Sequence, residues 1–194
     1  MPPKVKITKE MIVDAAFNIV RTEGENKITA RRLSEQLKCS TQPILYHFAS
    51  IDEIKKQVYQ KVDEYHASYI MNLESCVENP MLAIGINYIR FAIKESHLFR
   101  FLFQSNEFSG ANMLDLIDAE ELRPIISVFQ QEMNVSVSEA KEIFSTLFIF
   151  VHGYASLYAN NSMVYDEKIL MTTLTKIFYG AVYVAKEVND EETV

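Results

Sequence analysis

The stretch ITARRLSEQLKCSTQPILYHF, residues 28–48, decides the fold of the N-terminal part of this chain. Leu33 and Leu37 lie four residues apart in its first half, and Ile44 and Phe48 lie four apart in its second half. This spacing gives each half one apolar side, which predicts two short helices joined by a tight turn. Polar and basic side chains fill the other positions, so one face can be buried while the other can bind phosphates or base edges.

The residues before this stretch predict another helix, which completes a three-helix head. Thr8 is a suitable N-cap for it, and Gly24 is a suitable C-terminal stop. Thr29 is expected to cap the second helix and Ser40 the third. The inner stripe of the first helix is expected to consist of Ile12, Ala15, Ala16, Ile19 and Val20.

A long connecting helix and a helical body are expected after the head. Ser50 and Glu53 form an S-x-x-E capping box, which predicts a fourth helix that reaches about Cys76. Pro124 fits the first turn of a later helix. Residues 108–123 combine a Ser-Gly turn with a short helical pattern. The further helices are predicted at 81–96, 98–105, 124–133, 137–160 and 167–188.

Composition predicts a folded, all-α protein. The chain has 194 residues, of which 48% are hydrophobic, and it contains five glycines and five prolines. No stretch alternates polar and apolar residues as a half-buried strand requires. We therefore predict a head at residues 1–50 and a helical-bundle body at 51–194, of which 51–77 form the connecting helix.

The net charge of −7 is unevenly distributed along the sequence. Residues 1–60 hold ten basic and seven acidic side chains, whereas residues 61–194 hold nine basic and nineteen acidic ones. A basic head on an acidic body is compatible with nucleic-acid binding, because the local patch that meets the phosphates governs affinity.

Metal chemistry, catalysis and membrane insertion are not expected. Cys39 and Cys76 have no CxxC spacing or histidine cluster, and no catalytic pattern or cofactor motif stands out. Residues 1–10, MPPKVKITKE, have no apolar signal region, so we expect a cytoplasmic protein. The uncharged segment 143–165 is long enough to span a membrane, but its polar residues favour a buried helix that ends at Asn160 and Asn161.

Two groups of side chains are candidates for DNA binding. Around the second helix, the Thr29 hydroxyl either caps the helix alone or does so beside a bound phosphate, while Arg31 and Arg32 either pair with phosphates or solvate the surface. At the third helix, Gln42 either addresses an adenine edge or is an ordinary exposed residue. The further candidates are Lys38, Ser40, Thr41, Pro43, Tyr46 and His47.

These residues resemble the DNA-binding head of the TetR family of transcriptional repressors. The matching elements are Ile28-Thr29, the L-x-x-x-L pair, Ser40, Tyr46-His47-Phe48 and Asp52-Glu53-Ile54, and ITKEMIVDAAFNIVRTEG at residues 7–24 matches as well. The resemblance covers residues 1–55. It implies a homodimer that binds a double-stranded DNA operator and leaves it when a small hydrophobic effector binds the helical body. FIFVHGYASLYAN, residues 148–160, resembles a motif of one group of such bodies.

Four positions depart from the family pattern. Leu45 stands where a tyrosine is usual and Ile51 where a phosphate-binding lysine is usual, while Lys38 and Cys39 replace a glycine and a valine in the turn. The loss of one phosphate contact lowers the salt dependence of DNA binding by about one unit. Lys38, Lys55 and Lys56 are candidates to replace that contact.

The body offers candidates for an effector pocket and for a dimer interface. Its aromatic and methionine side chains either line a pocket or form ordinary core, and His97 and His152 are expected to be hydrogen-bonded structural residues. The pocket candidates are Tyr88, Phe91, Phe103, Met113, Phe129, Phe144, Phe148 and His152, with Met81 and Phe99 beside them. The interface candidates, mostly small residues that permit close helix packing, are Gly153, Tyr154, Ala155, Tyr158, Gly180, Ala181 and Ala185.

The sequence thus predicts a ligand-responsive, sequence-specific DNA-binding regulator, acting as a repressor. The alternative is a small-molecule-binding or interaction protein that has lost specific operator binding. Leu45, Ile51 and the negative net charge favour this alternative.

Overall fold

The computed structural model describes residues 6–73, 79–104, 117–161 and 163–191. In these ranges every regular element is a helix, which confirms the all-α prediction. The chain divides into two compact units, one formed by Met1–Ala67 with Glu95–Phe108 and the other by Ser68–Lys94 with Ser109–Val194. The first unit therefore extends beyond residue 50, where the sequence places the end of the head.

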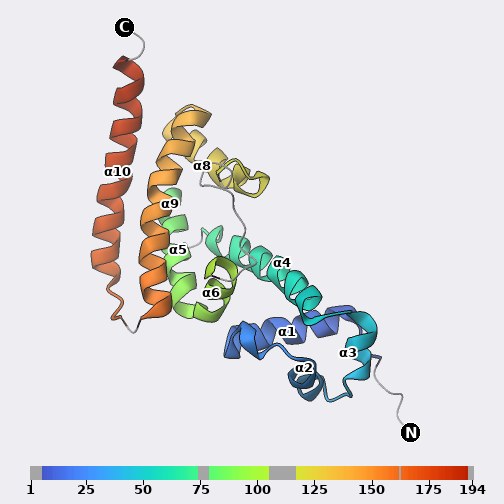
Figure 1. Ribbon diagram of the computed structural model, residues 1–194. Coiled ribbons are helices and arrows are strands. Elements are labelled where there is room, and N and C mark those ends of the chain that lie inside the picture. Colours follow the sequence, from blue (N-terminus) through green and yellow to red (C-terminus); the bar gives the residue numbers. More distant parts are fainter. Residues whose placement is uncertain (1–5, 74–78, 105–116, 162, 192–194) are drawn as a thin grey trace. The chain divides into compact units, whose positions relative to one another are not determined.

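The first helix of the head is α1, Lys9–Glu23 (Figure 1). The Thr8 hydroxyl accepts a hydrogen bond from the backbone N–H of Met11 at 3.2 Å, and Gly24 ends the helix at φ 90°, a conformation that favours glycine. Both predicted ends are confirmed. The predicted inner stripe is also buried along its whole length.

Helices α2, Ala30–Leu37, and α3, Gln42–His47, follow α1 after the 3₁₀ turn η1, Glu25–Lys27. The predicted cap of α2 is confirmed, because the Thr29 hydroxyl accepts from the N–H of Arg32 at 3.0 Å. The predicted cap of α3 is wrong. The first carbonyl that accepts from this helix belongs to Thr41 rather than Ser40, and no side-chain capping bond is made there.

Helix α4, Ile51–Ile70, begins as predicted but ends early. The Ser50 hydroxyl accepts from the N–H of Glu53 at 3.1 Å. The helix stops at Ile70, and the predicted end at Cys76 falls outside the described residues. The side-chain amide of Asn87 donates to the carbonyls of Ile70 at 3.3 Å and Asn72 at 2.8 Å, which satisfies backbone groups where the helix stops.

Three elements of the first unit meet at one ionic cluster. Glu95, which precedes α6, Ser96–Gln104, is a buried carboxylate. It accepts two hydrogen bonds from the guanidinium of Arg21 in α1 and one from the hydroxyl of Tyr65 in α4 at 3.2 Å. Because a buried charge needs such partners, this cluster holds α1, α4 and α6 together.

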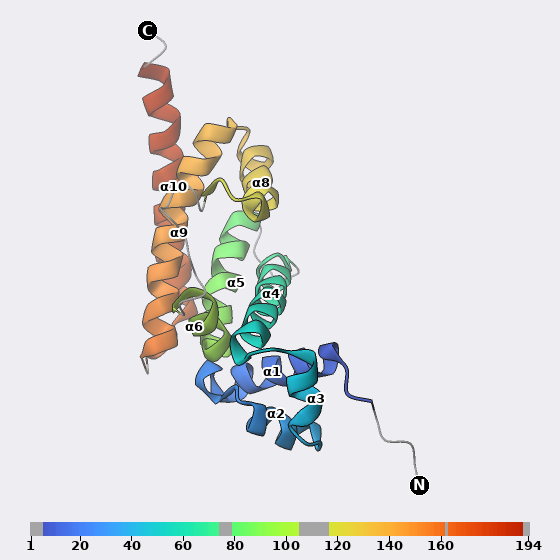
Figure 2. The same cartoon turned by 45° about the vertical axis from the view of Figure 1, so that its right-hand side comes forward.

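The second unit contains α5, Pro80–Lys94, η2, Glu120–Leu122, α8, Arg123–Met133, α9, Val137–Asn160, and α10, Glu167–Glu191. Figures 1 and 2 show α9 and α10 side by side, and α5 and α8 also pack on α9. Gly85 permits the close approach, because a Cβ at this position would lie 3.1 Å from Leu174 and 3.3 Å from Val151. Pro124 lies in the first turn of α8, as predicted.

Helix α9 contains most of the uncharged segment that is long enough to cross a membrane. It begins with a complete capping box between Ser136 and Glu139. It ends at Asn160 with Asn161 as its C-cap, where the sequence predicts the end of a helix. Over the ranges that the structure describes, no helix is long and apolar enough to span a bilayer. Buried side chains on α9 pack within the second unit.

Candidate nucleic-acid interface

The candidate interface is built on α2, the turn after it, and α3. Lys38 makes this turn possible by adopting the left-handed conformation, with φ 52° and ψ 44°. Leu33 of α2 and Ile44 of α3 are buried, so the two helices present their other sides outward. The first unit thus holds a short helix with a buried face and an open face, as a recognition helix requires.

The open face of α3 carries several of the predicted DNA-binding side chains. Thr41 and Gln42 are exposed, and Tyr46 is 83% exposed. Pro43 is half-buried, which leaves only part of its ring to contact a thymine methyl group. The structure therefore brings a hydroxyl, an amide and a phenol to one side of the same short helix.

The two arginines of α2 have different surroundings. The side chain of Arg31 is 89% exposed and lies 3.0 Å from Glu35 one turn later, so this ion pair is weak and readily exchanged for a phosphate. Arg32 instead makes a two-pronged contact with Glu23 of α1, with N–O distances of 2.6 and 3.1 Å. Of the two, Arg31 is the more accessible candidate for a phosphate contact.

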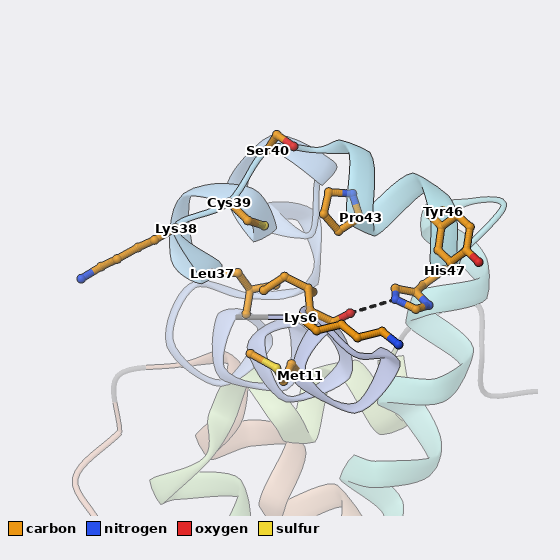
Figure 3. A pocket seen from close by; sticks show the side chains of 10 residues that line it. Lys6, Met11, Leu37, Lys38, Cys39, Ser40, Pro43, Tyr46 and His47 are labelled. Carbon is orange, nitrogen blue, oxygen red and sulfur yellow. Dashed lines mark hydrogen bonds between the residues drawn. The ribbon is translucent and has the colours of Figure 1, made fainter. Parts of the chain in front are cut away.

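A groove of about 1000 Å³ lies between the segment before α1, the turn and α3 (Figure 3). The imidazole of His47 donates from Nε2 to the carbonyl of Ile7 at 2.9 Å, which occupies a nitrogen that the sequence assigns to phosphate binding. Figure 3 shows the Lys38 side chain extending away from the groove. The groove is lined by Lys6, Ile7, Met11, Leu37, Lys38, Cys39, Ser40, Pro43, Tyr46 and His47.

The sequence interpretation missed two contributors to this surface. Lys6 is exposed and lines the groove, although it lies outside the quoted helix-turn-helix stretch. Leu45 is 63% exposed on α3. The basic pattern of residues 4–9 is a signal that could have drawn attention to Lys6, whereas the outward position of Leu45 follows from the burial of Ile44 beside it.

The lysines proposed to replace the lost phosphate contact also differ. Lys55 of α4 lies 3.2 Å from Glu25, and both side chains are partly buried, so this lysine is engaged within the first unit. Lys38 and Lys56 are exposed. Ile51 begins α4, and its apolar side chain provides no phosphate contact.

The predicted effector residues do not form one cluster. Tyr88 is buried, and its hydroxyl lies 2.8 Å from Nδ1 of His152, while burial raises the pKa of Tyr88 and lowers that of His152. Phe148 contacts both rings, and Phe144 stacks on Phe148 and meets Phe129 edge-on.

Other candidates lie elsewhere. Phe91 is fully buried and packs on Tyr69, which is a core position rather than a lining one. Phe103 belongs to the first unit, where it contacts His66 and Phe99. Met113 lies outside the described residues. In the part of the chain that the structure describes, no group of three potential metal ligands occurs.

The predicted interface residues separate into three groups by their exposure in the protomer. Gly153 and Gly180 are exposed, and a Cβ added to either glycine would meet nothing within 4 Å. Ala155 and Ala185 are buried within the single chain, so their side chains are not exposed to a partner in this structure. Tyr154, Tyr158 and Ala181 are partly exposed.

Comparison with protein-family models and with curated protein sequences gave no match. Among solved structures, apo ActR from Streptomyces coelicolor matches with a TM-score of 0.60 at 16% identity, over 96% of this chain and 100% of that one. AmtR from Mycobacterium smegmatis matches with a TM-score of 0.41 at 16% identity, over 95% of this chain and 88% of that one. The chain therefore shares its fold with apo ActR, and this all-helical fold agrees with the architecture that the resemblance of its head sequence implies.

Proposed function

We propose that this protein is a homodimeric, sequence-specific DNA-binding repressor that a small hydrophobic effector releases from its operator. The observation that carries the proposal is the open face of α3, where Gln42 and Tyr46 are exposed above a buried Ile44. A helix of this kind enters the major groove, and paired heads meet half-sites about one helical turn apart. Arg31, Lys38 and Lys6 supply positive charge around it.

Electrophoretic shifts with genomic fragments that surround the protein's own gene test this proposal. We expect a specific complex that persists at a salt concentration where binding to unrelated DNA is lost. Gln42→Ala should relax base preference, whereas Tyr46→Phe should weaken binding to every sequence. Equal effects of both changes on all sequences would remove the base-reading role from Gln42.

The proposed effector site lies in the second unit around Tyr88, Phe148 and His152. Three aromatic rings and a hydrogen-bonded hydroxyl suit an apolar ligand with one polar group. A screen for compounds that raise the melting temperature would identify ligands. Tyr88→Phe should then weaken both the thermal shift and the release of DNA for the same compound.

The proposed dimer joins α9 and α10 of one chain to the same helices of a second copy. Both helices carry exposed large apolar side chains, including Ile149 and Leu157 on α9 and Tyr179 and Tyr183 on α10. Such side chains on neighbouring helices favour a partner, and a four-helix packing would cover them. Sedimentation of the full chain is expected to give twice the mass of 22.4 kDa.

One observation favours a second candidate, a ligand-binding or interaction protein without an operator. Arg32 is engaged by Glu23 and Lys55 by Glu25, which leaves fewer cations for phosphates than the sequence predicts. Ligand binding and dimers without sequence-specific DNA binding would support that candidate.

A further inference from the structure

The side chain of Leu45 on α3 has no role in the DNA contacts proposed so far, which are phosphate contacts and the hydrogen bonds of the Gln42 amide. Among the described residues of the first unit, Leu45 and Tyr46 are the large apolar side chains that are mainly exposed, at 63% and 83%. A tyrosine can donate to a phosphate through its hydroxyl, but a leucine has no polar atom. Its exposed position on the open face of the candidate recognition helix makes it available to an apolar group of the DNA.

The geometry of the helix places Leu45 beside Gln42. Residues three apart share one face of a helix, and at 1.5 Å per residue their levels differ by about 4.5 Å. This rise is close to the spacing of about 3.4 Å between stacked base pairs. The two side chains are thus about one base-pair step apart, so Leu45 can reach a base pair next to the one that Gln42 addresses.

One base offers an apolar group at this depth of the major groove. Thymine carries a C5-methyl group there, whereas the other bases present hydrogen-bond donors and acceptors that a leucine cannot satisfy. Packing of the Leu45 side chain on this methyl group removes apolar surface of both partners from water. We propose that Leu45 selects thymine in each half-site, next to the base pair that Gln42 addresses. This inference rests on the DNA-binding function proposed above.

Replacement of thymine by deoxyuridine tests the contact, because it removes the methyl group and keeps every hydrogen-bonding group of the base. An operator is first selected from random duplexes with the wild-type full chain, and its thymines are then replaced one at a time. At one position in each half-site, we expect deoxyuridine to weaken wild-type binding about fourfold, and about sixteenfold when both half-sites are changed. Leu45→Ala should bind both duplexes equally.

Two variants serve as controls for this measurement. Gln42→Ala should keep the preference for thymine over deoxyuridine at the methyl-sensitive position. It should lose base selectivity at the neighbouring base pair, which Gln42 addresses. Leu73→Ala removes an exposed leucine of the second unit. It should change neither the preference for thymine nor the base selectivity at the neighbouring pair. Because the side chain of Leu45 is mainly exposed, Leu45→Ala should melt at the wild-type temperature.

The outcomes separate this inference from the function on which it rests. A selected operator without any methyl-sensitive thymine, or a methyl preference that survives in Leu45→Ala, would overturn the role of Leu45 and leave the regulator intact. An operator without any methyl-sensitive thymine would also fit a partner protein that binds the surface around Leu45. A selection that enriches no sequence would overturn the proposed function and this inference together.

Discussion

Nε2 of His47 lies 2.9 Å from the carbonyl oxygen of Ile7, forty residues earlier in the chain. This hydrogen bond connects the last turn of α3 to the segment that leads into α1. Lys6, which precedes Ile7, lines the same groove. The imidazole therefore sets the position of a basic residue at the candidate DNA interface in addition to any contact of its own.

We expect His47→Ala to destabilise the head by about 1 kcal/mol, because a carbonyl loses its donor and the segment before α1 is released. DNA affinity should fall on every sequence. Urea unfolding and filter binding measure the two effects. Tyr46→Ala is the matched control for stability, since its side chain is 83% exposed. A His47→Ala protein as stable as the wild type would contradict the role of this hydrogen bond.

Lys38→Gly should stabilise the protein by about 1 kcal/mol, because a left-handed backbone is less costly for glycine than for lysine. Lys38 has φ 52° in the turn between α2 and α3. The same change should lower DNA affinity and its salt dependence, if the ammonium meets a phosphate. Thermal melts and salt titrations of binding separate these opposite effects.

Asn134→Gly is the comparison for this prediction. Asn134 also adopts a left-handed conformation, with φ 49°, but asparagine tolerates it better than lysine does. Its gain in melting temperature should therefore be smaller. An equal gain at both positions would show that the side chain of Lys38 is not the source of the strain.

His66 should make stability depend on pH between about 6.5 and 4. Burial lowers the pKa of His66 from 6.5 to about 4, while the unfolded chain keeps the ordinary value. Between these pH values the imidazole is protonated in the unfolded chain but neutral in the folded one. The stability that neutral His66 permits is therefore fully present above pH 6.5 and is lost as the pH falls. Between pH 7 and pH 5 the loss is about 2 kcal/mol.

His66→Gln tests this prediction because glutamine is polar and does not titrate in this range. The difference in unfolding free energy between wild type and variant, measured in urea at pH 7 and pH 5, isolates the histidine from the carboxylates. His97→Gln, in α6 of the same unit, provides the comparison. If wild type and His66→Gln lose equal stability on acidification, His66 is not the responsible group.

The ends of most helices could be predicted because their causes are local. Thr8 and Gly24 bound α1 through a cap and a glycine conformation, both readable within a few residues. The end of α4 could not be predicted this way, because Asn87, which accompanies it, lies fifteen or more residues further along the chain.

In the candidate site too, features with a local cause could be predicted from the sequence, whereas contacts between distant residues could not. Exposure of Gln42 follows from the period of α3, which Ile44 and Phe48 set. Arg32 pairs with Glu23 of α1. This contact between two helices could not be predicted from periodicity or composition. In the body, aromatic spacing marks apolar positions, but it cannot assign Phe103 to one unit and Phe148 to the other.

Gly153 allows the proposed dimer interface to be tested separately from packing within the protomer. A Cβ at Gly153 would meet nothing within 4 Å in the protomer, whereas one at Gly85 would press on Leu174 and Val151. Gly153→Ala should therefore stabilise the folded chain by up to about 1 kcal/mol through helix propensity, while Gly85→Ala should destabilise it.

A larger residue at the same place should act on the dimer alone. We expect Gly153→Leu to leave the protomer folded but to dissociate the dimer at least about tenfold more readily, because a close helix contact cannot admit its side chain. Sedimentation over a range of concentrations gives the dissociation constant, and circular dichroism checks the fold. An unchanged dissociation constant for Gly153→Leu would place the interface away from this part of α9, since nothing in the protomer opposes the added side chain.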